Sequence, residues 1–479
     1  MEIHAQIVSN TKLFSSARNS VDCDPNTCVS FVDAAFPGTL PVLNEHCVFQ
    51  ALRTGIALNG RINTLSRFDR KHYFYHDLPM GYQITQYFEP IVSGGVLDLY
   101  IDEETTKTIR IDRIQLETDS GKSIHDAHPH LTLIDLNRAG IGLFEIISQP
   151  DINSPLEAGL FLKQMIFLLN HIGASPALMG QGSLRCDANV SVRKAESKDP
   201  LGERCEIKNL NSVKSLVNAI EYEAKRQVEL LESGNVVEME TRWFDPVSKT
   251  TFTARKKEDK IDYRFFPEPD LPPIIVEQNV ISSAHASMPK LPSQIIDELL
   301  ETFKSSGITK KMAHLICYEQ GGVEYFKSAV QEDPSLSPLI IMQWLLNDIF
   351  GFINADVTLN FNNLPMTPKQ LVQLIQLTEA EYVSVLKSKN VLEIILKEKD
   401  TRSPKQIIDD NNWGILQISL DELEGKCKEY INKFPKEAAL YRSGKSQMMQ
   451  FFVGHVMRDT KGKVSAKKVQ QIFDKMLNQ

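Results

Sequence analysis

The sequence predicts an α+β protein in which a region rich in strands is followed by helices alone. Before residue 280, polar and apolar residues alternate in steps of two in several segments, as in strands with one buried face. After about Leu291-Pro292, apolar residues recur at helical spacing between short loops. From about Asn411, a last group of helices predicts a small bundle. The predicted domains are residues 1–290, 291–410 and 411–479.

Composition sets the broad class of the protein. A length of 479 residues predicts two to four domains, and 42% hydrophobic and 24% charged residues are typical of a soluble globular protein. The net charge of −8 gives no overall basic signature, although residues 441–479 hold eight Lys and Arg against two Asp and Glu. Seven scattered cysteines without a CxxC pair argue against a disulfide framework and a zinc ribbon. We therefore expect a reducing compartment.

The first region carries four clear strand patterns and three clear helix patterns. No signal peptide or Arg-rich leader is evident, and a strand begins at once after Met1, so we expect further residues upstream. The predicted strands are Ile3–Val8, Val96–Ile101, Thr108–Leu116 and Leu131–Leu136. The predicted helices are Asn44–Leu58, Pro155–Ile172 and Ser212–Ser233. The proline-rich segment 266–273 can be neither a central strand nor a helix.

A hairpin is predicted within residues 182–212, around which the rest of the chain is organised. Small or apolar residues alternate with polar ones over residues 184–193, and again over 204–208 after a polar turn. If the buried sides match, five side chains share one exposed surface: Arg185, Asp187, Asn189, Glu206 and Lys208. Carboxylates there could hold a cation, and Arg and Lys could hold a phosphate. The alternative is a solvated strand face.

Two further pairs of potential metal ligands have the spacing of residues that share one face of a strand. Glu2 and His4 lie two residues apart, as do Glu117 and Asp119. Such pairs suit Mg²⁺, which prefers a few carboxylates with water and substrate phosphate completing its shell. The alternative is that they are ordinary surface residues.

The segment Phe68–Tyr75 mixes aromatic residues with Arg70, Lys71 and His72. Aromatic side chains beside cations can stack on a base and clamp a phosphate, or they can pack in a core with a charged rim. The segment Asp119–Ser123 resembles the end of a phosphate-binding loop but lacks the first glycine, so a P-loop is rejected. No GxSxG, HExxH or Gly/Ser-rich amidase loop occurs, so we find no nucleophile that would release ammonia from glutamine.

The second half of the chain reads as helices. Predicted helices are Gln294–Ser305, Lys310–Glu319, Gly321–Gln331, Pro338–Phe350, Thr367–Leu377 and Glu379–Lys387, followed by three in the tail. The apolar run 338–355 contains Gln343, Asn347 and Asp348, which favours a core helix over a membrane span. In the tail, Met448, Phe451, Phe452 and Val456 form an apolar stripe that predicts bundle core.

The stripe leaves a basic cluster outside the predicted bundle. Its members are Arg442, Lys445, Arg458, Lys461, Lys463, Lys467 and Lys468. Such a cluster on a small helical unit could bind an RNA backbone, and the alternative is again a solvated face.

Several stretches of the chain form a distinctive set of motifs. They are the opening strand MEIHAQI, PGTLPVLN (37–44), FDRKHYFY (68–75), GYQITQ (81–86), DSGKSIH (119–125), DLNRAG (135–140), GSLRCDANVS (182–191), EIKNLNS (206–212) and DYRFFPEPDLPP (262–273). Taken together, these stretches resemble one family, GatB, the B component of the glutamyl-tRNA(Gln) amidotransferase. The resemblance covers essentially the whole chain. Details such as VSFVDAAFPGTLPVLN and LETDSGKSIHD look more like mitochondrial members than bacterial ones.

The resemblance implies a ligase that works within a three-subunit complex. This subunit would use ATP and Mg²⁺ to phosphorylate the glutamate of Glu-tRNA(Gln), and ammonia from the amidase subunit (A) would then displace phosphate. A small subunit (C) would complete the complex. This division of labour fits the missing glutaminase nucleophile. The implied compartment is the mitochondrial matrix, with the bacterial cytoplasm as the alternative.

The resemblance also implies the domains and the site. The first domain would be a cradle around an antiparallel sheet, followed by a helical domain and a tRNA-binding tail. The implied catalytic and metal residues are Glu2, His4, Glu117 and Glu206. Relatives often carry Glu where this chain has Thr118. If that Glu is a metal ligand in the family, this chain lacks the corresponding carboxylate. Paired CxxC motifs that hold zinc in some relatives are absent, so we expect no zinc.

The expected cofactor-binding residues for ATP and Mg²⁺ are Arg70, Lys71, Tyr82, Lys122, Arg185, Asp187, Asn189 and Lys208. The expected tRNA-binding residues are Arg442, Lys445, Lys461, Lys463, Lys467 and Lys468. Two other functions stay open: a non-catalytic RNA-binding scaffold that presents tRNA to a partner, and a metal-dependent hydrolase.

Overall fold

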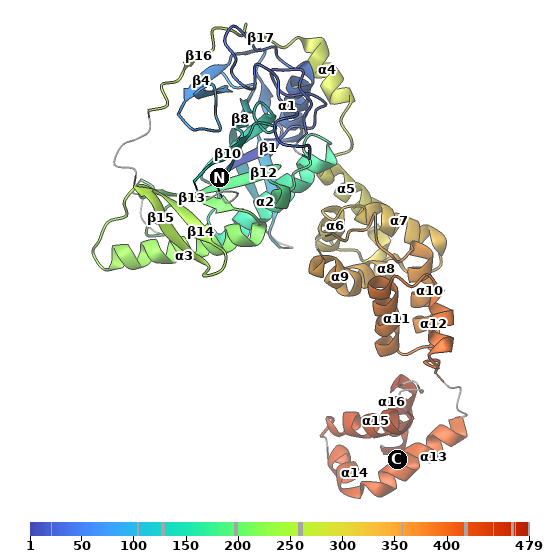
Figure 1. Cartoon of the computed structure of the whole chain (residues 1–479). Helices are drawn as coiled ribbons and strands as arrows, with labels where there is room; N and C mark the ends of the chain where they lie inside the picture. The colour runs from blue at the N-terminus through green and yellow to red at the C-terminus, as the bar shows by residue number, and fades with distance from the viewer. Residues whose placement is uncertain are drawn as a thin grey trace. The chain divides into compact units, whose positions relative to one another are not determined.

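The computed structural model describes the chain except residues 21, 103–104, 126–129, 196–199, 257–261, 357, 416–419, 444, 461–463, 465 and 478–479. The chain divides into two compact units, residues 1–295 and 296–479, which we describe separately. The first combines a large sheet with a few helices, and the second is helical (Figure 1). The predicted α+β class is therefore confirmed. The finer division into three domains stays a prediction.

A ten-stranded sheet forms the frame of the first unit, in the order β15-β14-β13-β12-β1-β11-β8-β6-β2, with β7 paired to β8. Every pairing among its described strands is antiparallel except β13 with β14. The strands are β1 (Glu2–Gln6), β2 (Arg61–Ile62), β6 (Val92–Ser93), β7 (Val96–Tyr100), β8 (Thr106–Thr118), β11 (Gly142–Ser148), β12 (Leu184–Val190), β13 (Cys205–Leu210), β14 (Glu240–Asp245) and β15 (Thr250–Lys256).

Three small sheets accompany the large one. They are β16 (Phe266–Pro267), β4 (Asp69–His72) and β5 (Tyr82–Thr85); β9 (Lys122–Ile124) with β10 (Leu133–Asp135); and β3 (Leu65–Ser66) with β17 (Ile274–Ile275). The proline-rich segment enters only as β16, a two-residue strand at the edge of its sheet. That position agrees with the expectation that proline cannot occupy a central strand.

The helices of the first unit are α1 (Glu45–Ala57), α2 (Pro155–His171), the short η1 (Met179–Gln181), α3 (Val213–Glu232) and α4 (Gln278–Ala286). The predicted boundaries of the three long helices hold because polar side chains cap them: Asn44, Ser154 and Ser212 each accept a hydrogen bond from a backbone N–H in the first turn. Helix α4 was not predicted from the sequence.

The core lies between the apolar face of the large sheet and its helices. Alternation along β1 buries Ile3 and Ala5, and alternation along β12 buries Cys186 and Ala188. These residues join one hydrophobic cluster with side chains of α2 such as Phe161. The same alternation turns every second residue of β1 and β12 toward the opposite, polar face.

The second unit consists of helices and short helical turns. They are α5 (Pro292–Thr302), which begins at its border, η2 (Lys304–Ser306), α6 (Lys310–Cys317), α7 (Gly322–Glu332), α8 (Pro338–Trp344), η3 (Leu345–Ile349), α9 (Phe350–Ala355), α10 (Pro368–Glu379), α11 (Val385–Glu398), α12 (Pro404–Asp410), α13 (Leu420–Lys433), α14 (Pro435–Arg442), α15 (Met448–Asp459) and α16 (Ala466–Leu477).

The helix predicted over residues 379–387 is wrong. Helix α10 ends at Glu379, and Glu381 adopts a left-handed backbone with φ of 54° that no helix can continue. Val383 then pairs with Gly414 in an isolated bridge before α11 begins at Val385. The tail also differs from expectation, because its described residues form four helices where the sequence predicted three, with α14 as the addition.

The apolar run 338–355 is the one described helical stretch long and apolar enough to cross a membrane by length and composition. A π-helical turn, η3, interrupts it between α8 and α9. Ile341, Met342 and Leu345 are fully buried within the unit, and Asp348 pairs with Lys389 at 2.8 Å. One face of the stretch therefore packs inside the unit.

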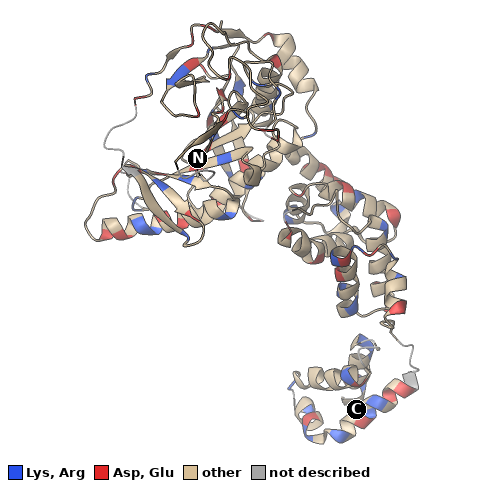
Figure 2. Ribbon diagram, in the orientation of Figure 1, with Lys and Arg blue, Asp and Glu red and all other residues tan. Residues whose placement is uncertain are grey.

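The tail helices have a hydrophobic cluster of their own, to which α13, α14, α15 and α16 all contribute. Phe452 and Val456 are fully buried in it, and Phe451 packs against it, as the apolar stripe predicts. Met448, the fourth member of the predicted stripe, is only half-buried, and Met449 joins the cluster in its place. Basic and acidic side chains are interspersed along these helices rather than separated by sign (Figure 2).

Candidate active site on the polar face of the sheet

Five neighbouring strands, β13, β12, β1, β11 and β8, line up charged side chains on the polar face of the large sheet. On β1, Glu2 lies opposite Asp187 of β12, and His4 lies between Arg185 of β12 and Glu145 of β11. Because residues at matching register positions point to the same face, five strands converge on one surface. Two groups of potential metal ligands form on it.

The first group, here called the outer cluster, consists of Glu2, Asp187 and Glu206. One carboxylate oxygen from each lies within 4.8 Å of the others, and all three side chains are half-buried. Lys208 Nζ lies 2.7 Å from Asp187 Oδ2 and 3.1 Å from Glu206 Oε1. Asn189 donates from Nδ2 to Glu2 Oε1 at 3.1 Å. The outer cluster is therefore an oxygen-only site with a lysine beside it.

A threonine of β14 orients one member of the outer cluster. Thr241 lies opposite Glu206 in the parallel pairing of β13 and β14. Its hydroxyl donates to Glu206 Oε2 at 3.0 Å, while Lys208 contacts the other oxygen. Both carboxylate oxygens of Glu206 thus have a partner that restricts its rotamers.

The second group, here called the inner cluster, consists of His4, Glu117 and Glu145. Its ligand atoms also lie within 4.8 Å of one another, but the two carboxylates are buried. His4 Nε2 lies 3.6 Å from Glu145 Oε1, and Gln115 donates to the other oxygen of Glu145. Lys71 of β4 reaches the cluster, with Nζ 3.4 Å from Glu117 Oε2.

Burial and charge act against each other in the inner cluster. Burial by itself lowers the pKa of His4, but the hydrogen bond and charge of Glu145 outweigh it and raise that pKa. The same contact outweighs burial at Glu145 and lowers its pKa. For Lys71, attraction to Glu117 and Glu145 outweighs burial and raises the pKa. At Glu117 burial prevails and raises the pKa. The contact between His4 and Glu145 therefore favours the ionised form of each, and the carboxylates of the cluster favour the ionised form of Lys71.

Arg185 lies on the same face, but its guanidinium is already paired. Its Nη2 donates to Asp119 Oδ1 at 2.7 Å, and Arg138 Nε lies 3.6 Å from the other oxygen of Asp119. Attraction to Asp119, which is buried, raises the pKa of Arg185. Asp119 therefore holds two cations, Arg185 and Arg138, at the edge of the polar face.

The structure distributes the four expected metal ligands over both clusters. Glu2 and Glu206 belong to the outer cluster, where Asp187 joins them, and His4 and Glu117 belong to the inner one, where Glu145 joins them. Glu145 was missed because it lies in a strand that is buried along most of its length and shows no alternation. No sequence signal short of the strand pairing would have found it.

Thr118 cannot replace a carboxylate of either cluster. It follows Glu117 on β8, so its side chain points to the opposite side of the strand. Its hydroxyl accepts a hydrogen bond from the backbone N–H of Ile84 at 3.2 Å, and its carbonyl accepts one from Gln83. A glutamate at this position would face β5 rather than the clusters.

Three expected cofactor-binding residues lie apart from the clusters. Arg70 forms a bidentate pair with Glu268, both contacts at 2.8 Å, and also contacts Asp270 at 3.1 Å. The ring of Tyr82 packs against the Arg70 guanidinium, 4.3 Å from its centroid. Lys122 is exposed on β9, opposite Asp135. Arg70 therefore serves to join β4 to the segment 268–270.

The residues predicted to form the basic cluster of the tail differ in their surroundings. Lys461 and Lys463 lie outside the described residues. Arg442 Nε donates to the carbonyl of Leu477 at 3.1 Å, and Lys468 pairs with Glu381 at 3.1 Å. Lys445 and Lys467 are exposed.

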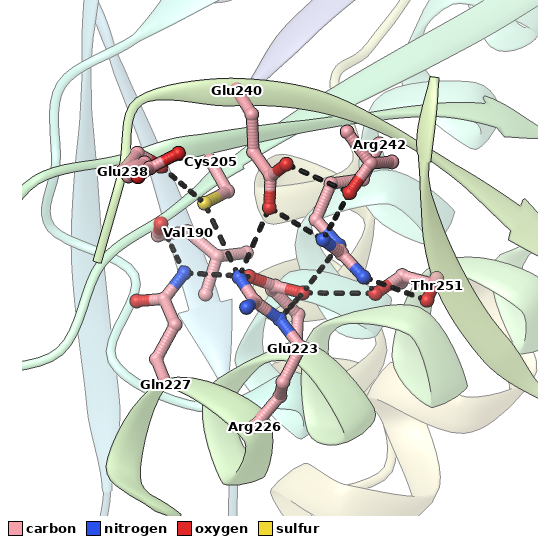
Figure 3. A network of polar contacts seen from close by, with 10 residues as sticks. Val190, Cys205, Glu223, Arg226, Gln227, Glu238, Glu240, Arg242 and Thr251 are labelled. Atoms are coloured by element: carbon pink, nitrogen blue, oxygen red, sulfur yellow. Dashed lines mark hydrogen bonds and ion pairs between the residues drawn. The ribbon is translucent and has the colours of Figure 1, made fainter. Parts of the chain in front are cut away.

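A buried ion-pair network holds the strands of the outer cluster from behind (Figure 3). Its centre is Glu223 of α3, which is fully buried and accepts from Arg226, Gln227 and Thr251. Arg242 of β14 lies 3.2 Å from Glu223 and also pairs with Glu240. Glu240 and Arg242 flank Thr241, so the network fixes β14 on one face while Thr241 orients Glu206 on the other.

Comparisons with known proteins agree with this architecture. Residues 1–282, which carry both clusters, match the family described as GatB/GatE catalytic domain, so the sheet unit is of a catalytic class. Residues 324–477 match the family described as GatB domain. The chain therefore belongs to the GatB family of tRNA-dependent amidotransferases.

The chain is similar to curated relatives over nearly their whole length. The chain is 45% identical over 478 residues to the B component of the aspartyl/glutamyl-tRNA(Asn/Gln) amidotransferase of Rickettsia canadensis (strain McKiel), covering 100% of this chain and 96% of the relative. It is 44% identical to the protein of the same name from Rickettsia rickettsii (strain Iowa) and 45% identical to that from Rickettsia typhi (strain ATCC VR-144 / Wilmington), with the same coverage.

Proposed function

We propose that this chain is the transamidating component of a tRNA-dependent amidotransferase and converts Glu-tRNA(Gln) to Gln-tRNA(Gln). The observation that carries the proposal is the outer cluster with its lysine, placed on the sheet of a unit that matches a catalytic domain. A carboxylate is a poor acyl donor at neutral pH. The glutamate side chain must therefore be phosphorylated, at the expense of ATP, before ammonia can displace phosphate.

The residues present fit Mg²⁺ and a phosphate group. The outer cluster offers three carboxylates and is partly open to solvent, which suits a hard cation that keeps several water or phosphate ligands. The inner cluster adds an imidazole to two carboxylates and can hold a second divalent ion. When bound, Mg²⁺ neutralises phosphate charge and orients the transferred group. Lys208, beside the outer cluster, and Arg185, which lies on the same face in its pair with Asp119, are the candidate cations for phosphate oxygens.

Partner subunits complete this proposal. The chain has no glutaminase motif, so ammonia must come from an amidase partner, and a small third subunit would complete the complex. The exposed lysines of the tail would contribute affinity for tRNA through its phosphates without taking part in the chemistry.

The compartment remains a prediction. Sequence details such as VSFVDAAFPGTLPVLN favour the mitochondrial matrix and support of mitochondrial translation. The relatives reported above are bacterial, which agrees with the alternative, a bacterial cytoplasm.

The experiment is Glu206→Gln in the assembled complex, assayed for Gln-tRNA formation from Glu-tRNA with ATP and free ammonium salts. Loss of one oxygen ligand weakens both cation binding and stabilisation of transition-state charge, so we expect a rate lower by ~10²-fold or more. Affinity for tRNA should stay nearly unchanged. Glu203→Gln, at an exposed position just before β13, is the matched control and should keep the parent rate.

Near-parental amidation by Glu206→Gln would refute the proposed site. ATP consumption separates the enzyme from a scaffold that only presents tRNA. If Glu206→Gln turns over ATP as fast as the control in the presence of Glu-tRNA, the activating chemistry does not take place at this cluster.

A further inference from the structure

Five aromatic side chains follow one another from solvent to the inner cluster. This set, here called the aromatic run, consists of Phe88, Tyr87, Phe265, Tyr263 and Tyr73. The ring centroids of Tyr87 and Phe265 lie 4.1 Å apart and nearly parallel, at 10°. The other successive rings lie 5.1 to 6.3 Å apart. The run joins the loop after β5, the segment before β16 and the end of β4, which are far apart in sequence.

The two ends of the aromatic run differ in exposure. At the outer end, Tyr87 is 43% exposed and Phe88 is 59% exposed. At the inner end, Tyr73 and Tyr263 are half-buried. Lys71 Nζ lies 5.6 Å from the ring centroid of Tyr263 and 3.4 Å from Glu117 Oε2. Adjoining exposed aromatic side chains are typical of a binding surface. Here the surface leads directly to a cluster of the candidate active site.

The segment that carries Tyr263 and Phe265 is held in place by its backbone. The N–H of His72 donates to the carbonyl of Tyr263 at 2.8 Å, and the His72 ring contacts the carbonyl of Arg264 at 3.1 Å. Arg264 adopts a left-handed backbone, with φ of 46°, which Asp262 stabilises by accepting its N–H at 2.9 Å. An ordinary side chain keeps such a conformation only where its surroundings impose it. The stacking surface is therefore preformed.

Arginines accompany the rings. The guanidinium of Arg113, which also pairs with Asp112 at 2.8 Å, lies 5.5 Å from the ring centroid of Tyr87. Arg264, which separates Tyr263 from Phe265, is exposed and carries a second cation beside the rings. Aromatic rings on which bases stack, interleaved with cations that contact the backbone, are the way proteins bind single-stranded nucleic acid. Five rings in succession exceed what the single base of a free nucleotide can cover.

We propose that the aromatic run binds the unpaired 3′ end of the tRNA, with bases stacked on Tyr87 and Phe265. In this arrangement the aminoacylated terminus lies at the inner end, beside Lys71 and Glu117. The proposal rests on the proposed function and deepens it, because it assigns the path by which the single-stranded end reaches the carboxylates. A free nucleotide has the same base chemistry, and the experiment distinguishes the two sources.

The test measures binding without turnover. The assembled complex, without ATP, is titrated with uncharged tRNA that keeps its unpaired 3′ nucleotides and with the same tRNA trimmed of them. The parent should bind the intact tRNA more tightly. Tyr87→Ala and Phe265→Ala should each reduce that preference by about tenfold. Phe74→Ala is the matched control, since Phe74 is 86% exposed and no ring contact joins it to the run among the described residues.

Each outcome decides. A preference for intact tRNA that survives both alanine variants overturns the proposal. So does weaker equilibrium binding of ATP by these variants, measured in a separate titration without tRNA, combined with an unchanged preference, because that result would assign the run to the nucleotide. If Tyr87→Ala does not fold, Tyr87→Phe and Tyr87→Leu replace it. The ring-keeping variant should then retain the preference, and the leucine variant should lose it. Because no turnover is measured, the result stands apart from that of Glu206→Gln.

Discussion

Glu223 provides the sharpest test of how the buried network holds the strands of the active site. One of its carboxylate oxygens accepts from Arg226 Nη2 at 2.6 Å and Gln227 Nε2 at 2.8 Å. The other accepts from Arg226 Nε and Thr251 Oγ1, both at 2.9 Å, and lies 3.2 Å from Arg242 Nε. In Glu223→Gln the shape is kept, but one oxygen becomes an NH₂ group. In either orientation that group faces at least two donors.

The magnitude follows from burial. Glu223 is fully buried, so Glu223→Gln leaves the guanidinium groups of Arg226 and Arg242 without their central anion. Removing one partner of a buried pair costs about 3–5 kcal/mol. That is a large share of a total free energy of unfolding of about 5–15 kcal/mol. At a urea m-value of about 3 kcal/mol/M, the midpoint should fall by about 1 M or more.

The assay is urea unfolding of the full chain followed by circular dichroism, with Glu221→Gln as the matched control. Glu221 lies on the same helix and pairs with Lys225 at the surface. Because exposed pairs contribute little, the control should unfold at the parental midpoint. Equal midpoints for the parent, Glu221→Gln and Glu223→Gln would refute the reasoning.

The pH dependence adds a second check. Burial raises the pKa of Glu223, but hydrogen bonds from Arg226 and Gln227 outweigh burial, so its pKa lies below the usual value. A carboxylate with a lowered folded-state pKa stabilises the fold above its unfolded-state pKa, about 4.3, and loses this contribution as pH falls through the folded-state pKa. The difference between the parent and Glu223→Gln should therefore be full at pH 7 and shrink in acid.

Two further predictions concern the tail and the cysteines. Reversing charge at Lys445 and Lys467 should raise the KM for tRNA and flatten the salt dependence of binding, whereas Lys311→Glu in α6 should not; equal salt slopes for all three proteins would exclude the tail as an RNA arm. Cys23 should be alkylated first at pH 8, because a hydrogen bond with Ser20 lowers its pKa, whereas the other cysteines are buried. Peptide mass spectrometry of the partly alkylated chain checks the order.

Local patterns in the sequence predicted part of the secondary structure, although β11, β14 and β15 of the large sheet were missed. Alternation in β1 and β12 predicted which residues share the polar face, and Asn44, Ser154 and Ser212 marked three helix starts through their caps. The hairpin prediction also held, because β12 and β13 are adjacent and antiparallel and Lys208 contacts Asp187 across them. These features depend on neighbours in sequence, so the sequence alone could reveal them.

Tertiary pairing decided how those residues combine. β11 lies between β1 and β8, so its Glu145 joins His4 and Glu117, while β12 and β13 bring Asp187 and Glu206 to Glu2 on the other side. The four residues expected at one metal site therefore lie in two clusters, and their role as ligands stays a prediction.

The sequence predicted that Arg70 binds the cofactor, yet the carboxylate of Glu268, 198 residues away in the chain, pairs with its guanidinium. The same kind of long-range contact assembled the aromatic run. Which side chains meet depends on strand order and register, which are set by burying the apolar face of the whole sheet and leave no local mark in the sequence.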